Sequence, residues 1–196
     1  MKTIDMRGKP CPMPVVSAKK ELEKADSVQI LVDNILAVQN LKRMADGIGY
    51  GFTSIVENID SFIVTIFKEE NAEETENSES PAAAKEGATV LITSDRLGNG
   101  SDELGRILIK GFLFSLTELS VPPKAVIFIN SGVHLATEGS NTIADLQVLS
   151  GKGTKILVCG TCLNYYKLTD KLAAGEVTNM MEIAGLLTSA AKLVTL

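Results

Sequence analysis

The chain has 196 residues, 45% of them hydrophobic, and a formal net charge of −5. The excess negative charge is confined to residues 69–87, which carry seven Glu and one Lys, whereas residues 1–68 and 88–196 are each close to neutral. Without a basic face, direct binding of nucleic acid is not expected. No apolar run approaches the ~18 residues of a membrane span, and no apolar signal region is found, so we expect a cytoplasmic protein with no membrane association.

The acidic stretch 69–87 also marks a boundary between domains. It contains no large apolar side chain that could be buried in a core, and such a composition is typical of a disordered linker. The sequence therefore predicts two domains, residues 1–68 and residues 88–196, joined by an acidic linker at 69–87.

The first domain alternates strand and helix patterns in the order βαβαββ. Strands are expected at residues 3–6, 28–32, 52–57 and 62–67, and helices at residues 13–25 and 35–48. This order predicts a two-layer α/β sandwich, in which two helices cover one face of a small sheet. The other face is then left to solvent or to a partner.

The second domain is expected to be a doubly wound parallel α/β structure. Near-continuous apolar runs at residues 88–93, 125–130 and 155–159 are typical of strands buried on both faces, and helical patterns separate them. Helices are expected at residues 102–119, 142–149, 165–173 and 180–190, with a last strand at 192–196. Ser101 should cap the first of these helices. Its inward stripe is expected to be Leu104, Ile107, Leu108, Gly111, Phe112 and Ser115, and Met180 and Met181 are expected in the core.

A single cysteine, Cys11, stands where the first strand gives way to the first helix. Pro12 and Pro14 follow it, and proline is tolerated in the first turn of a helix, so helical conformation should begin at Pro12 with Cys11 at its cap. The positive end of the helix dipole, together with Arg7 and Lys9, would favour a thiolate over a thiol. The alternative is an unreactive, buried cysteine.

The other two cysteines lie at the end of a predicted strand, in Cys159-Gly-Thr-Cys162. Because the carboxyl ends of parallel strands share one edge of a sheet, loops 94–101, 131–140 and 159–162 should form a single rim, which brings His134 to the cysteine pair. The pair suits a redox or sulfur-carrying role, half of a zinc site, or simple packing. His134 could be a surface residue or a functional neighbour of the thiols.

Two further motifs are interpreted as structural. Tyr165 and Tyr166 are expected to form a half-buried wall, with substrate contact as the alternative. Gly98-Asn99-Gly100 lacks the third glycine of a dinucleotide-binding fingerprint, because Glu103 occupies that position. We therefore expect this segment to be a loop. No motif implies a cofactor or a bound metal.

Two stretches resemble known families. Asp5-x-Arg7-Gly8-x-x-Cys11-Pro12-x-Pro14 closely resembles the signature of the TusA/SirA family of small sulfur carriers, whose fold has the same βαβαββ order. The second domain, with Asn130-Ser131-Gly132-Val133 and Cys159-Gly-Thr-Cys162, is similar to the DsrE/DsrF-like sulfur-relay fold. Joined in one chain, the two domains resemble the bacterial YedF-like family, described as sulfurtransferase-like and linked to selenium metabolism.

These resemblances imply a role for each cysteine and for its partners. Cys11 would accept a sulfane sulfur as a persulfide from a cysteine desulfurase or another sulfur or selenium donor, supported by the motif residues Arg7, Gly8, Pro12 and Pro14. Cys159 matches the position of the active cysteine in DsrE-like relays, and Cys162 is close enough to serve instead. An acceptor protein would take the cargo, and a homo-oligomer could form through the C-terminal domain.

The leading hypothesis is therefore a persulfide carrier or sulfurtransferase that relays sulfur or selenium between Cys11 and the Cys159/Cys162 rim. One alternative is a thiol/disulfide oxidoreductase that uses Cys159 and Cys162 alone. The other is a non-catalytic module that binds a partner through its open sheet face.

Overall fold

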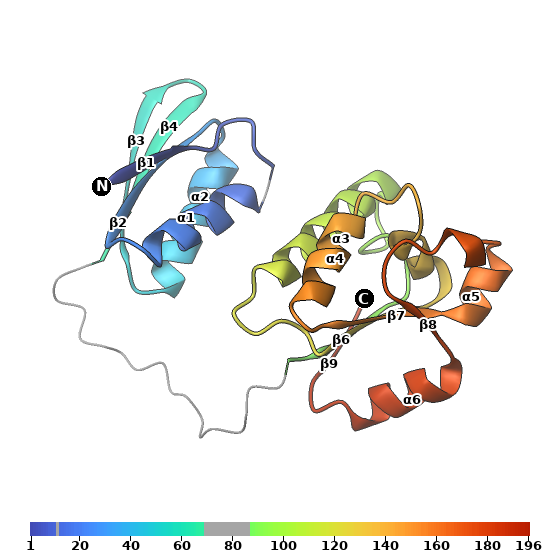
Figure 1. The fold of residues 1–196 in the computed structure, drawn as a ribbon. Coiled ribbons are helices and arrows are strands. Elements are labelled where there is room, and N and C mark those ends of the chain that lie inside the picture. Colours follow the sequence, from blue (N-terminus) through green and yellow to red (C-terminus); the bar gives the residue numbers. More distant parts are fainter. Residues whose placement is uncertain (11, 69–86) are drawn as a thin grey trace. The chain divides into compact units, whose positions relative to one another are not determined.

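The computed structural model describes residues 1–10, 12–68 and 87–196 of the chain. The chain separates into two compact units, divided between Ser80 and Pro81 (Figure 1). The expected acidic linker lies outside the described residues, except for Gly87.

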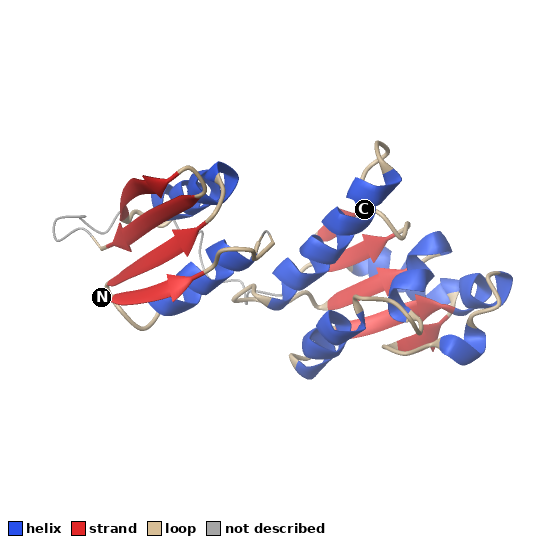
Figure 2. Ribbon diagram, turned by 90° about the horizontal axis from the view of Figure 1, so that it is seen from above, coloured by secondary structure: helices blue, strands red, loops and turns tan. Residues whose placement is uncertain are grey.

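The N-terminal unit has the expected βαβαββ order. Its elements are β1 (Lys2–Asp5), α1 (Met13–Leu22), β2 (Ser27–Val32), α2 (Ile35–Gly47), β3 (Gly51–Asn58) and β4 (Ser61–Phe67). The strands lie in the order β1-β2-β4-β3, with β1 parallel to β2 and the other neighbours antiparallel. Both helices lie on the same side of this sheet (Figure 2).

Alternation along the two central strands creates the N-terminal core. Val28, Ile30 and Val32 of β2 face the helices together with Val64 and Ile66 of β4, and all five are fully buried. They pack against Ala18, Leu22, Val38, Leu41 and Ala45 of the helices. Burial of each large aliphatic side chain stabilises the fold by about 1.5–3 kcal/mol.

The helix boundaries in this unit differ slightly from those expected. Pro12 is the N-cap residue rather than the first helical residue, and α1 ends at Leu22, so that Ala25 is exposed outside the helix. Ile35 and Ile48, expected on the buried stripe of α2, are 53% and 42% exposed because they lie at its two ends, beyond the sheet.

The C-terminal unit is a five-stranded, fully parallel sheet in the order β8-β7-β6-β5-β9. Its strands are β5 (Thr89–Ile92), β6 (Ala125–Phe128), β7 (Lys155–Cys159), β8 (Glu176–Thr178) and β9 (Leu193–Thr195). Its helices are α3 (Asp102–Thr117), η1 (Asn130–Ala136), α4 (Ile143–Gly151), α5 (Gly160–Tyr165), η2 (Thr169–Lys171) and α6 (Met180–Ser189). Helices α3 and α4 cover one face and α6 covers the other (Figure 1), which confirms the doubly wound prediction.

The predicted inward stripe of α3 is wrong for three of its residues, although Phe112 packs against the core as expected. Gly105, Ile109, Leu113 and Leu116 are buried, whereas Leu104, Ile107 and Leu108 are 53%, 63% and 45% exposed. The helix is apolar over most of its circumference, so periodicity alone does not select the buried side. Gly105 identifies the buried side of α3, because its backbone lies against Arg96 and Leu97 at a distance that leaves no room for a side chain.

Three other expectations for this unit are also corrected. The helix expected at 165–173 is reduced to the three-residue η2, because α5 ends at Tyr165 and Lys167 adopts a left-handed φ of 58° that stops the helix. β6 ends at Phe128, since Asn130 turns the chain with a φ of 51°. Met180 and Met181 are 59% and 83% exposed rather than in the core, because they lie in the first turn of α6.

Candidate functional site

The loop between β1 and α1 carries Cys11, which itself lies outside the described residues. Main-chain hydrogen bonds hold the residues on both sides of it: Met6 N–H donates to Leu31 of β2, and Met13 N–H donates to the Pro10 carbonyl. Gly8 adopts a φ of 70°, a conformation that glycine takes without strain. The loop is thus attached to the carboxyl end of β2 and to the start of α1.

Asp33, at the end of β2, is the second anchor of this loop. Its carboxylate accepts the backbone N–H of Gly8 and the side-chain amide of Asn34, and these bonds lower the pKa of Asp33. Asn34 in turn caps α2 by accepting the Ala37 N–H at 2.8 Å. Sequence reasoning missed Asp33 because it is 25 residues from Gly8 along the chain; an Asp-Asn pair at a strand–helix junction was the available signal.

Arg7 is held by an ion pair with Asp5, two residues before it. Its guanidinium donates to both carboxylate oxygens of Asp5, with Nε at 2.9 Å from Oδ1, and Asp33 and Glu57 also act on it electrostatically. The hydrogen bonds from Arg7 lower the pKa of Asp5 to about 2. Arg7 therefore orders the start of the motif through Asp5, and its expected effect on the Cys11 thiol stays a prediction.

In the C-terminal unit, both rim cysteines are free thiols at the carboxyl end of β7. Cys159 is the last residue of the strand and the N-cap of α5, and it is 1% exposed. Cys162, in the first turn of α5, is half-buried. Burial raises the pKa of Cys162, and a hydrogen bond with Cys159 raises it further, while the Asn130 N–H acts in the opposite direction. Burial thus opposes loss of the Cys162 proton, whereas the Asn130 N–H favours it.

Asn130 connects the end of β6 to Cys162. Its backbone N–H donates to the Cys162 sulfur at 3.1 Å, and its side-chain oxygen accepts the Tyr166 hydroxyl at 2.9 Å. Both contacts depend on the left-handed φ of 51°, which asparagine tolerates better than most residues. Sequence reasoning did not select Asn130 as a site residue, although an Asn-Ser-Gly segment after a buried strand is a signal for such a turn.

His134 and the two tyrosines complete this side of the rim. The exposed His134 ring meets the Tyr166 ring edge-on, with 4.8 Å between centroids, and Tyr166 meets Tyr165 in the same way at 5.1 Å. Tyr166 is half-buried, as expected for a wall, but Tyr165 is 79% exposed. The structure thus brings Cys159, Cys162 and His134 to one rim, with Tyr166 and Asn130 between the thiols and the histidine.

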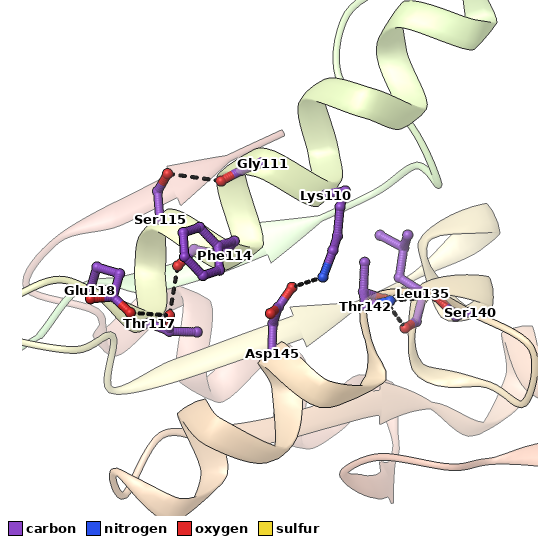
Figure 3. A network of polar contacts seen from close by, with 10 residues as sticks. All are labelled: Lys110, Gly111, Phe114, Ser115, Thr117, Glu118, Leu135, Ser140, Thr142 and Asp145. Atoms are coloured by element: carbon purple, nitrogen blue, oxygen red, sulfur yellow. Dashed lines mark hydrogen bonds and ion pairs between the residues drawn. The ribbon is translucent and has the colours of Figure 1, made fainter. Parts of the chain in front are cut away.

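Buried polar contacts support the segment that carries His134 (Figure 3). The hydroxyl of Thr142, which is fully buried, donates to the Leu135 carbonyl and lies 2.7 Å from the Ser140 hydroxyl. One turn further along α4, Asp145 forms an ion pair with Lys110 of α3. These bonds attach η1 to the start of α4, and α4 to α3.

A cavity of about 390 Å³ is lined in part by His134. Charged side chains of both signs line it, namely Asp95, Arg106, Glu138 and Lys171. Arg106 lies 3.6 Å from the Asp95 carboxylate. The cavity has room for a small polar molecule.

Within the described part of the chain, no group of three or more His, Cys, Asp and Glu side chains is arranged to hold a metal ion. The Cys159/Cys162 pair is therefore without further protein ligands for zinc among those residues. None of the helices among the described residues is long and apolar enough to cross a membrane.

Comparison with known proteins defines the class of each unit. Residues 2–68 match the family model described as sulfurtransferase TusA, and residues 109–196 match that of the DsrE/DsrF-like family. A Methanocaldococcus jannaschii protein, provisionally named a sulfur carrier protein, is 34% identical over 71 residues, which cover 35% of this chain and 95% of the relative. The chain therefore belongs to the TusA family through its N-terminal unit, and that unit is followed by a DsrE/DsrF-like domain.

Three solved structures are also similar to parts of the chain. A SirA-like protein from Desulfitobacterium hafniense is 40% identical, with a TM-score of 0.34. The matched region covers 35% of this chain and 100% of the SirA-like chain. The ychN protein from E. coli is 18% identical, with a TM-score of 0.46, over 56% of this chain and 99% of its own. A protein of unknown function from Methanobacterium thermoautotrophicum is 19% identical, with a TM-score of 0.45, over 57% and 99%. The two families and the sulfur-carrier relative together support a role in sulfur relay.

Proposed function

We propose that this protein is a persulfide carrier and sulfurtransferase that accepts a sulfane sulfur, or selenium, on Cys11 and relays it to Cys162. The family of residues 2–68 supports the first site. The observation that carries the second is the hydrogen bond from the Asn130 N–H to the half-buried Cys162 sulfur. Of the two rim thiols, Cys162 combines access from solvent with a donor that stabilises negative charge on sulfur.

The relay consists of two exchanges at sulfur. The Cys11 thiolate attacks the terminal sulfur of a donor persulfide, and the donor leaves as a thiolate. The Cys162 thiolate then attacks the terminal sulfur of the Cys11 persulfide, and the Cys11 thiolate leaves. Because the pKa of Cys162 is raised, its thiolate is scarcer at neutral pH but intrinsically more nucleophilic once formed.

The partners in this scheme are proteins with exchangeable sulfur. A cysteine desulfurase, or another sulfur or selenium donor, would load Cys11, and an acceptor protein would take the cargo. The resemblance to YedF-like proteins favours a cytoplasmic role in selenium metabolism. A homo-oligomer formed through the C-terminal domain would allow Cys11 of one chain to reach Cys162 of another.

The test is to locate added sulfur by mass spectrometry after brief exposure to a cysteine desulfurase and cysteine. We expect a gain of about 32 Da, one sulfur atom, on Cys11 and then on Cys162. Cys11→Ala should abolish enzymatic loading of Cys162, whereas Cys162→Ala should leave Cys11 loaded. Loading of Cys162 at the unmodified rate in the Cys11→Ala variant would contradict the relay and favour a redox pair that works alone.

A further inference from the structure

The two rim thiols differ in what can reach them. Cys159 packs among apolar side chains of β5, β6, β7 and α6, including Leu91, Ile127, Leu157 and Ile183, and is 1% exposed. A partner protein cannot approach a thiol at that depth. Cys162 is partly accessible from solvent, and it packs against the apolar cluster that contains Cys159. The reaction open to Cys159 is therefore with whatever is attached to Cys162.

We infer that Cys159 is a resolving thiol, which cleaves the Cys162 persulfide and releases its outer atom as sulfide, or as selenide if selenium is the cargo. This inference rests on the proposed function for the loading of Cys162. In this role the C-terminal domain is an enzyme that ends the relay by releasing a small inorganic product. It also remains a carrier that can pass a persulfide to an acceptor protein.

The step balances without an external oxidant. The Cys159 sulfur attacks the inner sulfur of Cys162–S–S⁻, so that a Cys159–Cys162 disulfide forms and the bond to the outer sulfur breaks. The outer sulfur leaves with the electron pair and takes up the proton of the Cys159 thiol, giving HS⁻. The sulfane sulfur is reduced by two electrons, and the two cysteines are oxidised by two. A dithiol reductant must then reduce the disulfide before the next cycle.

The surroundings of each thiol favour attack on the inner rather than the outer sulfur. Attack on the outer atom would move the persulfide anion to Cys159, among apolar side chains that stabilise no charge. Attack on the inner atom instead releases the outer sulfur, with its negative charge, from Cys162. Cys162 lies at the rim beside the exposed Asn130 and its N–H. The neutral disulfide, which is compatible with apolar packing, is the group left behind.

The chain contains three cysteines, so a Cys11→Ala background isolates the pair. The full-length variant is loaded with inorganic polysulfide in the cold, desalted, and warmed while free sulfide is trapped and the protein is mapped by mass. We expect about one sulfide per loaded chain, with the gain of about 32 Da replaced by a loss of about 2 Da, as in a disulfide that joins Cys159 and Cys162.

Variants at each rim cysteine separate the two roles. Cys11→Ala with Cys159→Ala, or with Cys159→Ser if the alanine variant does not fold, should retain the added sulfur on Cys162 and release sulfide at least about tenfold more slowly. Cys11→Ala with Cys162→Ala should take up no sulfur on the buried Cys159. A persulfide that persists on Cys162 while Cys159 is present, or sulfide release unchanged by loss of Cys159, would overturn the inference.

Failure of the proposed function is recognised separately. If polysulfide-loaded chains release sulfide as described, but a desulfurase places no sulfur on Cys11 of the unmodified protein, the relay is wrong and the pair is a self-contained persulfide reductase. If Cys11 loads and transfers to Cys162 but no disulfide follows, the relay stands and the resolving role of Cys159 is wrong.

Discussion

Gly132→Ala should damage the rim by pushing η1 away from β5. A Cβ at this position would lie 2.6 Å from the Ile92 carbonyl oxygen and 3.2 Å from its carbon, both rigid main-chain atoms. That carbonyl accepts the Ile129 N–H at 3.0 Å, so relief of the clash strains the segment that leads to Asn130. Overpacking of this kind costs about 1–3 kcal/mol of folding free energy. The shift should also move the Asn130 N–H away from the Cys162 sulfur.

The assay is urea unfolding of the full chain by circular dichroism, together with the rate at which sulfur is loaded onto Cys162. Gly185→Ala is the matched control, because this exposed glycine inside α6 has open space at its Cβ position. The same added methyl group should stabilise that helix by about 0.5–1 kcal/mol. If Gly132→Ala were as stable as the unmodified protein and loaded Cys162 at the same rate, our account of the close contact between η1 and β5 would be refuted.

Three further predictions concern charge. Lys110→Met should destabilise the C-terminal unit by about 1–2 kcal/mol, because it leaves the largely buried Asp145 carboxylate unpaired, and adding Asp145→Asn should recover most of the loss in a double-mutant cycle. In an NMR titration the pKa of the Asp5 carboxyl should be near 2, and in Arg7→Gln it should return toward 3.8. Because the folded-state pKa is lowered, the stability that Asp5 contributes is present above about pH 4 and is lost as pH falls through 2. The rate of Cys162 alkylation should rise with pH, with a midpoint above that of a free cysteine. The folding stability linked to the raised pKa of Cys162 should be lost as pH rises through that midpoint. A midpoint at or below the value of a free cysteine would contradict the burial of this thiol.

Local patterns predicted the strands well, both where one face is apolar and where both faces are. The alternation in β2 and β4, and the continuous apolar runs of β5, β6 and β7, indicated a one-sided sheet and a two-sided sheet, and both are present. Patterns failed where a helix is apolar over most of its circumference, as in α3, or where a non-glycine residue takes a left-handed conformation, as Lys167 does after α5. In those places long-range packing, rather than the local sequence, decides the outcome.

By itself the sequence determined that there are two α/β units, that Cys11 stands between the first strand and the first helix, and that His134, Cys159 and Cys162 belong to the ends of parallel strands. Only the tertiary structure decided which groups meet: Asp33 with Gly8, Asn130 with Cys162, and a buried Cys159 behind an accessible Cys162. The physical reason is that strand and helix periods are local properties of the chain. Hydrogen bonds between residues 25 or 32 positions apart, and the burial of one thiol but not its neighbour, depend on how whole elements pack.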